Sequence, residues 1–399
     1  MTDEAAAPPL AGAIAVEISR GVAAGHAGRL LSTLGAETVL VEPPEGNPLR
    51  REPPLLPPAH EASALFAFLA AGKKSVTCDL TSAAGQAGLS VLLTEADVLV
   101  HDLRPDERAN LELDEPTLRA RYPKLIDVSV LPFGAFGPKV DWRAEEINLI
   151  HASGEGFLLP NGLAAELFPE RPPLKVYGHF AEYQGGVVAA LGALSSLVSR
   201  VQGGAESVDV SIQDATLAVG AFALQRLGDG SLEHRRTRSF KYGGVLECAD
   251  GYVELLTLEE RQWRGLIELM ERPDWMLDPA LSDSLERSRR GPEINRAIRA
   301  WAREQRTADV VARAQALGVP MAKYASPAEV LSGPHEAARH LFQPVEIPGA
   351  GRLPVLSAPF HVDGAALPLR AGPPRLGEHQ HLLSTRRHRE RPAVAAEVS

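Results

Sequence analysis

Hydrophobic and polar positions alternate between two spacings along the first third of the chain. The runs GAIAVEIS and AETVLVEPP are strand-like, and the segment AGHAGRLLSTLG between them has apolar residues at helical spacing. The same order returns in KKSVTCDL, AGQAGLSVLLTEA and DVLVHDL, and once more in LRARYPKLIDVSVLPFG. Strands that alternate with helices are typical of a parallel sheet with crossover helices. The pattern predicts a doubly wound, Rossmann-like α/β core, although none of its turns carries GxGxxG or a P-loop motif.

The pattern changes twice further along the chain. From Tyr183 the segment EYQGGVVAALGALSSLVSRVQGG has small residues at close intervals, which predicts a tightly packed, buried helix. After Gly228, the alternating strand GYVELLTL and helical blocks rich in Arg, Glu and Trp indicate a smaller α+β domain. Strand-like blocks return after Pro320, and the last segment has no apolar periodicity. We expect that segment, residues 386–399, to be a disordered tail.

Composition and charge narrow the class of protein. The 399 residues are 45% hydrophobic and 23% charged and include two cysteines, which is typical of a globular protein without a disulfide framework. The formal net charge of -10 gives no electrostatic reason to expect a nucleic-acid partner. The longest apolar stretch, Val187 to Val198, is too short to cross a bilayer, and the acidic start MTDEAAAPPLAG is unlike a signal peptide. We therefore expect a soluble cytoplasmic protein without membrane contact.

A series of motifs runs in one order along nearly the whole chain. It comprises ISRGVAAGHAGRLLSTLGAETVLVEPPEGNPLR, GKKSVTCDL, EADVLVHDLRPD, FGAFGP, YGHFAEYQGGVVAALGAL, ESVDVSIQDA, CADGYVEL, GVPMAKYASPAEVL, LFQPVEIPGAGRLPVLSAPFHVDG and LGEH. In this order and spacing the motifs resemble the class III CoA-transferase family. That family includes formyl-CoA transferase, carnitine CoA-transferases, benzylsuccinate CoA-transferase and the related α-methylacyl-CoA racemases.

The resemblance implies an architecture as well as an activity. It implies a large Rossmann-like, CoA-binding domain formed by both chain ends, here residues 1–224 and 326–385, with the smaller α+β domain inserted at residues 225–325. It also implies an intertwined dimer whose chains thread through each other. The substrates would be an acyl-CoA, such as succinyl-CoA, and an organic acid, with coenzyme A as a substrate.

Members of this family are similar in using an Asp carboxylate, just before a helix of small residues, as the covalent acceptor of the acyl group. The matching stretch AEYQGG places Glu182 at that position. A carboxylate there can form a mixed anhydride, which the CoA thiolate reopens as an enzyme-bound thioester, and Gly185 and Gly186 would offer N–H groups to the oxyanion. The alternative is a helix N-terminal carboxylate without a covalent role, because Glu places its oxygens about one C–C bond farther out than Asp.

The expected CoA site departs from the family at three positions. Relatives carry Gln or Leu where Ala23 stands, a basic residue near Pro43, and an Arg where this chain has Asn110. The phosphates of CoA require cations. The basic residues that could supply them, or could instead be solvated loop charges, are Lys73, Lys74, Arg104, Arg108, Lys139 and Arg143.

The racemase branch is similar but relies on a His shortly after the FGxxGP segment. Glu145 and Glu146 stand where that His would fall, and we expect the later His151 to be a packed helix residue, so racemisation is disfavoured. The resemblance places a flexible active-site cover in the segment EHRRTRSFKYGG, which includes Tyr242, Gly243 and Gly244. The cations of this segment could bind a dicarboxylate or a phosphate of CoA, or could belong to an exposed linker. They are Arg235, Arg236, Arg238 and Lys241. Cys78 and Cys248 are expected in the core, and no metal site is indicated.

Two roles remain open for a CoA-transferase with this sequence. In one, Glu182 is the nucleophile of a homodimer. In the other, the chain is the degenerate partner of a hetero-oligomer, as in the benzylsuccinate CoA-transferases with their two unlike subunits, and the catalytic Asp lies on a related subunit. The altered nucleophile together with three altered CoA contacts favours the second role. A third hypothesis is a CoA-binding or scaffold protein without turnover.

Overall fold

The computed structural model describes residues 8–160, 162–200, 206–220 and 242–384. By internal contacts the chain divides into two units. The first unit comprises residues 1–155, 176–221 and 333–399, and the second comprises residues 156–175 and 222–332. Residues 156–175 therefore group with the second unit, whereas the sequence analysis assigned them to the large domain.

The first unit is built on a six-stranded sheet in the order β5-β2-β1-β6-β7-β8, and all its neighbouring strands are parallel. The strands are β1 (Ile14–Ile18), β2 (Glu37–Glu42), β5 (Lys74–Thr77), β6 (Val98–His101), β7 (Ile126–Leu131) and β8 (Ser207–Ser211). The predicted mixed α/β fold with a parallel sheet is confirmed. The direction of winding reverses between β1 and β6, and in such sheets ligands bind outside the carboxyl ends of the strands at the reversal.

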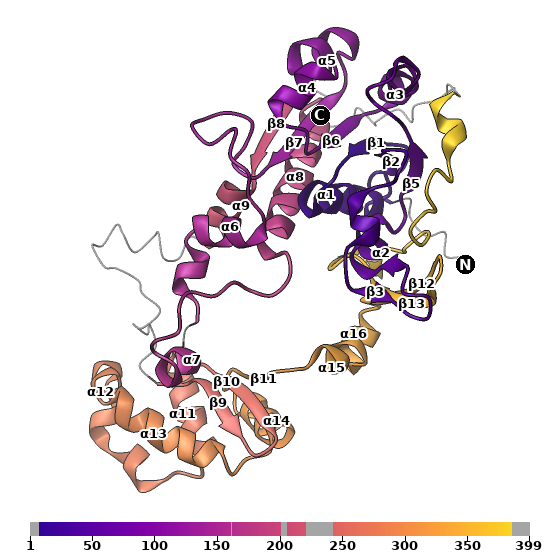
Figure 1. Cartoon of the computed structure of the whole chain (residues 1–399). Coiled ribbons are helices and arrows are strands. Elements are labelled where there is room, and N and C mark those ends of the chain that lie inside the picture. The colour runs from indigo at the N-terminus through magenta and orange to yellow at the C-terminus, as the bar shows by residue number, and fades with distance from the viewer. Residues whose placement is uncertain (1–7, 161, 201–205, 221–241, 385–399) are drawn as a thin grey trace, which may run out of the picture. The chain divides into compact units, whose positions relative to one another are not determined.

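Helices cover both faces of this sheet (Figure 1). Alternate residues of β1 point to opposite faces, so Ala15 packs in one core and Val16 in the other. The first core includes residues of α1 (Val22–Thr33) and α8 (Phe180–Ser199), and the second includes residues of α3 (Ala83–Glu95). The remaining helices of this unit are α2 (Ala64–Ala70), α4 (Pro105–Asn110), α5 (Glu115–Arg121), α6 (Glu146–Ala152), α9 (Ile212–Val219) and α16 (Pro334–Ala338).

Helix α8 is buried along one face only, which corrects the expectation of a wholly buried helix. Its small residues Ala189, Ala190 and Ala193 lie in the core. On the opposite face Leu191 is 60% exposed and Val198 is 73% exposed. None of the helices within the described ranges is both long enough and apolar enough to cross a membrane.

The C-terminal segment of the described chain returns to the first unit. Strands β12 (Phe342–Ile347) and β13 (Gly351–Leu356) form an antiparallel pair whose apolar residues pack against α2. Farther on, the Gln380 side chain accepts a hydrogen bond from the backbone N–H of Thr77 at 2.9 Å. Short antiparallel pairs are also formed by β3 (Leu55–Leu56) with β4 (Ala62–Ser63), and by β14 (His361–Val362) with β15 (Ala365–Ala366).

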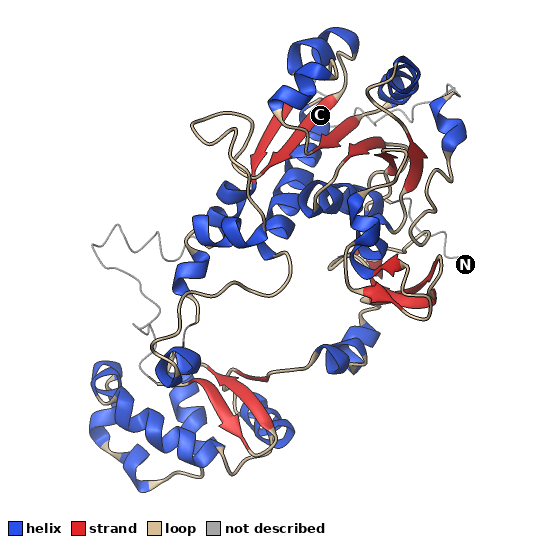
Figure 2. Cartoon of the chain, viewed as in Figure 1, coloured by secondary structure: helices blue, strands red, loops and turns tan. Residues whose placement is uncertain are grey.

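The second unit has a three-stranded antiparallel sheet in the order β11-β10-β9, with helices around it (Figure 2). Its strands are β9 (Gly244–Cys248), β10 (Gly251–Leu255) and β11 (Met321–Lys323). Its helices are α7 (Gly162–Leu167), α11 (Glu260–Leu269), α12 (Ser284–Arg289), α13 (Gly291–Ala302), α14 (Thr307–Ala316) and α15 (Pro327–Leu331). A separate core, which includes the buried Trp263, packs this sheet against α11, α13 and α14.

Candidate active site

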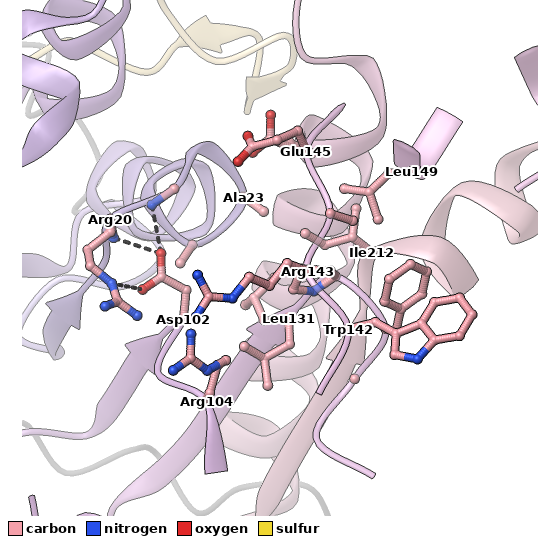
Figure 3. A pocket seen from close by; sticks show the side chains of 18 of the residues that line it. Arg20, Ala23, Asp102, Arg104, Leu131, Trp142, Arg143, Glu145, Leu149 and Ile212 are labelled. Atoms are coloured by element: carbon pink, nitrogen blue, oxygen red, sulfur yellow. Dashed lines mark hydrogen bonds and ion pairs between the residues drawn. The ribbon is translucent and has the colours of Figure 1, made fainter. Parts of the chain in front are cut away.

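A cavity opens in the first unit at the carboxyl ends of β1, β6 and β7, where the strand order reverses (Figure 3). Its volume is about 340 Å³. We call it the Glu182 pocket. Its charged lining residues are Arg20, Asp102, Arg104, Arg143, Glu145 and Glu182, and its larger apolar ones include Val130, Leu131, Phe133, Trp142, Leu149 and Ile212.

Glu182 lies in the first turn of α8, and its side chain is 16% exposed. Its Oε2 accepts a hydrogen bond from Nδ1 of His179, at 2.6 Å. The positive end of the helix dipole at this turn stabilises a carboxylate. The structure therefore places the Glu182 carboxylate in a cavity, held through one of its two oxygens.

Glu146 binds the start of α8 from a different element, α6. Its Oε1 accepts a hydrogen bond from the N–H of Ala181 and its Oε2 from the N–H of Glu182, both at 3.1 Å. Two N–H groups that have no partner within the helix are thereby satisfied. From the sequence, Glu146 was noted only as a position where the racemase branch would have a histidine, because its contact with α8 leaves no signal in the local sequence.

Gly185 and Gly186 allow α8 to approach its neighbours closely. A Cβ on Gly186 would lie 2.6 Å from the carbonyl oxygen of Ala23 in α1, and a Cβ on Gly185 would lie 2.8 Å from the Ile212 side chain. Both glycines lie in the interior of α8, where the N–H groups take part in helical hydrogen bonds. We therefore assign these glycines to packing and do not assign them to an oxyanion site.

Asp102 directly follows β6, lines the pocket and binds the backbone just before α1. Its Oδ2 accepts hydrogen bonds from the N–H groups of Arg20 and Gly21, both at 2.7 Å, as Figure 3 shows for Arg20. Burial raises the pKa of Asp102, and the two N–H donors oppose that rise. Arg20 in turn forms a two-point ion pair with Glu107. Because Asp102 already binds these N–H groups, they are not available to a phosphate of CoA.

Two of the expected CoA-binding arginines line the Glu182 pocket. The side chains of Arg104 and Arg143 point toward each other in the pocket (Figure 3). Arg104 forms an ion pair with Asp106 at 3.1 Å. Arg143 is exposed, and the structure records no ion pair for it among the described residues. The pair can therefore bind a carboxylate or a phosphate in the pocket.

Lys73 and Lys74 do not reach a pocket. Lys73 is buried, with its Nζ 2.6 Å from Oε2 of Glu17 and 2.7 Å from the carbonyl oxygen of Gly25. Lys74 forms an ion pair with Glu37 at 2.8 Å. Both lysines precede or begin β5 and so lie at the amino end of that strand, whereas the Glu182 pocket is at the carboxyl ends of its strands. Ala23, by contrast, lines the Glu182 pocket.

Arg108 is also a structural residue. It is 8% exposed, its Nε donates to the carbonyl oxygen of Leu113 at 2.9 Å, and its guanidinium forms an ion pair with Asp127. Burial alone would raise the pKa of Asp127, but the hydrogen bond from His101 and the charge of Arg108 lower it overall. These contacts satisfy the Arg108 side chain inside the fold.

A second cavity, of about 730 Å³, lies at the carboxyl ends of β2, β5, β1 and β6. We call it the Asn110 pocket. Pro43 and Asn110, two of the positions at which the resemblance implies basic residues, both line it. Its remaining polar and ionisable lining residues are Ser19, Arg20, Glu42, Glu45, Arg51, Cys78, Asp79, Thr81 and Glu107.

Charge in the Asn110 pocket disfavours an anion. Glu42 is neutralised by Arg50, and Glu107 by Arg20. Among the lining residues this leaves the carboxylates of Glu45 and Asp79 against the single guanidinium of Arg51. Hydrogen bonds from Thr81 lower the pKa of Asp79, so that carboxylate is ionised at neutral pH. A phosphate placed here meets more negative than positive charge.

Other candidate residues lie outside these pockets. Gly243 and Gly244 belong to the second unit, where a Cβ on Gly243 would lie 2.8 Å from the carbonyl oxygen of Leu255. The expected cover-loop cations Arg235, Arg236, Arg238 and Lys241 lie outside the described residues. Tyr242 packs edge-on against Trp263 in the second unit.

The remaining sequence expectations concern histidine and cysteine. Glu145 lines the Glu182 pocket, whereas His151 is exposed on α6, which corrects the expectation that it is packed. Cys78 and Cys248 are both buried, as predicted. Within the described ranges, no three His, Cys, Asp or Glu side chains gather so that they could hold a metal ion.

Comparison with known proteins identifies relatives that match most of the chain. The family model described as CoA-transferase family III matches residues 10–380. The chain is 29% identical over 376 residues to "Probable CoA-transferase Rv1866" of Mycobacterium tuberculosis; the match covers 92% of this chain and 46% of that protein, so this chain spans about half its length. It is 26% identical over 373 residues to "Succinyl-CoA:(R)-benzylsuccinate CoA-transferase subunit BbsE" of Thauera aromatica, covering 89% of this chain and 88% of that protein.

The fold is also similar to solved structures. The crystal structure of Rv3272 from M. tuberculosis aligns with a TM-score of 0.82 and 26% sequence identity, covering 94% of this chain and 99% of that chain.

Proposed function

Because the chain belongs to CoA-transferase family III, we propose that it exchanges CoA between an acyl-CoA and an organic acid, with Glu182 as the covalent acceptor. The observation that carries this proposal is the position of the Glu182 carboxylate in a cavity at the first turn of α8, with one oxygen hydrogen-bonded and the other facing Gly21. This differs from the role that the sequence favoured, in which the chain is a degenerate partner.

The exchange proceeds through two covalent intermediates on Glu182. The Glu182 carboxylate attacks the thioester carbonyl carbon of the acyl-CoA, and the C–S bond breaks. The CoA thiolate departs, and an acyl-glutamyl anhydride is formed. The thiolate then attacks the side-chain carbonyl carbon of Glu182, which releases the first acid and forms a glutamyl-CoA thioester. The second acid reverses these two steps: its carboxylate displaces the thiolate, which attacks the new acyl group and restores the Glu182 carboxylate.

The walls of the Glu182 pocket supply complementary surfaces for an acyl group and an acid. Val130, Leu149 and Ile212 form an apolar wall suited to the acyl chain. Arg104 and Arg143 present guanidinium groups that can pair with a carboxylate of a dicarboxylic acid or with a phosphate of CoA. These residues fit an acyl-CoA and an organic acid as substrates.

A second candidate role is that of one subunit in a hetero-oligomer, and the Asn110 pocket favours it. With Pro43 and Asn110 in place of basic residues, and with Glu45 and Asp79 nearby, this pocket is a poor site for the phosphates of CoA. A related subunit carrying the family Asp would then perform the exchange. If the chain is such a subunit, the isolated chain binds CoA poorly and shows no turnover. If it binds CoA but exchanges none, either alone or with a related subunit, the scaffold hypothesis is supported.

The exposed apolar residues of α8 support a dimer, formed either by two copies of this chain or by this chain and a related subunit. Val187, Leu191 and Val198 lie at helical spacing on its exposed face, and each is at least 45% exposed. We propose that a second CoA-transferase subunit covers this face, in line with the intertwined dimer implied by the resemblance. The strand order supports a Rossmann-like large domain, and a thioester of CoA as substrate supports a cytoplasmic location.

The decisive experiment traps the covalent intermediate. Incubation of the purified protein with succinyl-CoA should leave an adduct on the peptide containing Glu182, seen by mass spectrometry and removed by hydroxylamine. The Glu182→Gln variant should lose both the adduct and the exchange, whereas Glu145→Gln, a matched change in the same pocket, should keep the adduct. An adduct or full exchange in Glu182→Gln would contradict the proposal.

A further inference from the structure

His179 and Glu182 form a close pair at the start of α8. His179 precedes the helix, and its Nδ1 lies 2.6 Å from Oε2 of Glu182, three residues later. A carboxylate can only accept, so the pairing requires a proton on Nδ1 of His179. The two side chains are 32% and 16% exposed, and Glu182 lines the pocket.

We propose that His179 holds one oxygen of Glu182 in place and donates to that oxygen while it carries the negative charge of the second step. This inference rests on the proposed role of Glu182 as nucleophile. It assigns to His179 the stabilisation that the sequence analysis expected from Gly185 and Gly186, whose N–H groups lie inside α8.

The geometry distinguishes the two oxygens of Glu182. Oε2 is bound to His179, whereas Oε1 lies 4.0 Å from the position that a Cβ would occupy on Gly21. Oε1 therefore faces the Gly21 side of the Glu182 pocket and is the oxygen placed to attack a thioester there. A Glu has one more side-chain torsion than an Asp, and a misplacement of about 1 Å can cost roughly a hundredfold in rate. The bond to His179 fixes the longer side chain against that loss.

The same hydrogen bond acts on the second step. Once Oε1 is acylated, Oε2 is the carbonyl oxygen of the glutamyl anhydride. When the CoA thiolate attacks the adjacent carbon, the electron pair of that C=O bond moves onto Oε2, where the Nδ1–H of His179 is already placed to stabilise it. The pair returns when the carboxylate of the first acid leaves. Removing one such donor in other enzymes costs about 100- to 1,000-fold in kcat.

Two ring side chains near the pair keep their charge state around neutral pH. His26 on α1 has its pKa lowered to about 4 by burial, and Tyr183 on α8 has its pKa raised to about 12 by burial and by the charge of Glu182. Both therefore stay neutral between pH 5.5 and 9. The charged or titratable groups on the other elements at this site are Glu145, Glu146, Asp102, Arg20, Arg104 and Arg143.

The test compares His179→Asn, which keeps a side-chain N–H near the position of Nδ1, with His179→Ala, which removes it. His179→Ala should lower the rate of exchange and of adduct formation about 100- to 1,000-fold, with the Kd for CoA changed less than about threefold. His179→Asn should recover to within about tenfold of the wild type. His151→Ala, which removes an exposed histidine on α6, is the matched control and should leave the rate unchanged.

Equal losses in His179→Ala and His179→Asn, or no loss in either, would overturn the inference. An independent measurement follows the Nδ1 proton of His179 by NMR in 15N-histidine-labelled protein, where its strongly shifted signal should disappear in Glu182→Gln. If the wild type makes no adduct at all, the proposed function fails. The NMR signal then tests the pairing of His179 with Glu182 independently of activity. Absence of the signal in the wild type would overturn the inference whatever the activity.

Discussion

The two cavities of the first unit share one sheet edge but differ in charge. The Glu182 pocket and the Asn110 pocket both lie at carboxyl ends of strands, and Arg20 lines both. The Glu182 pocket is lined by three carboxylates, Asp102, Glu145 and Glu182, and by three guanidinium groups, of which Arg143 has no ion pair among the described residues. In the Asn110 pocket, the carboxylates without an ion pair, Glu45 and Asp79, outnumber the one such guanidinium, Arg51. Both cavities lie at the carboxyl ends of β1 and β6, so the difference in charge comes from the loops that follow the strands. The fold therefore provides the crevice, and its loops decide what it binds.

Adding positive charge to the Asn110 pocket should have the largest effect, because it removes the difference in charge between the two pockets. Each charge-assisted hydrogen bond contributes about 1.5–3 kcal/mol, so Pro43→Arg combined with Asn110→Arg should tighten CoA binding by about two to four orders of magnitude. Calorimetry with CoA measures the gain.

The control adds the same charge outside both pockets. Thr94→Arg with Ala120→Arg places two arginines on exposed positions of α3 and α5 and should leave the Kd nearly unchanged. An equal gain in both double variants would show that net charge, and not the Asn110 pocket, sets the affinity.

The contrast between two adjacent lysines gives the next largest effect. Lys73 is buried in an ion pair with Glu17, so Lys73→Met should destabilise the protein by roughly 3–5 kcal/mol because it leaves an unpaired buried carboxylate. Lys74 is in a half-exposed pair with Glu37, so Lys74→Met should cost less than about 1 kcal/mol. Urea unfolding compares the two variants directly.

A compensating variant tests the cause. Glu17→Leu combined with Lys73→Met removes both buried charges and should recover much of the stability lost in Lys73→Met. If Lys73→Met unfolds at the wild-type midpoint but loses CoA affinity, Lys73 is a ligand, as the sequence analysis expected, and not a structural residue.

The sequence predicted the sheet better than it predicted the site. Runs such as IAVEI and TVLVE are apolar on both sides, as a sheet covered on both faces requires, so the strands were visible in the local pattern. It also identified Pro43 and Asn110, which the structure places in one pocket. These features depend on residue type and order alone.

The errors among the cations have a common physical origin. From the sequence, Lys73 and Arg108 were candidates either for contacts with CoA or for solvated loop charges, but each is buried against a carboxylate outside its local segment, Glu17 or Asp127. No local pattern shows such a pairing. Strand direction does carry a usable signal, because residues that begin β5 lie at the edge opposite the ligand crevice. The three-residue spacing of His179 and Glu182 was likewise available in the sequence and was missed.

The smallest expected effect concerns the acid stability conferred by the buried cation Arg108. His101 and Arg108 lower the pKa of Asp127 below its unfolded value near 4, so the folded state binds fewer protons than the unfolded state in that range. The ionised Asp127 therefore contributes stability above about pH 4, and this contribution is lost as the pH falls through its lower folded pKa. In Asp127→Asn the fall in melting temperature between pH 5 and pH 3 should be shallower than in the wild type. Asp106→Asn, on an exposed carboxylate paired with Arg104, is the control and should change that slope less. An unchanged slope in Asp127→Asn would mean that Arg108 is not held by a charged partner and could turn toward the Asn110 pocket, which would narrow the difference between the two cavities.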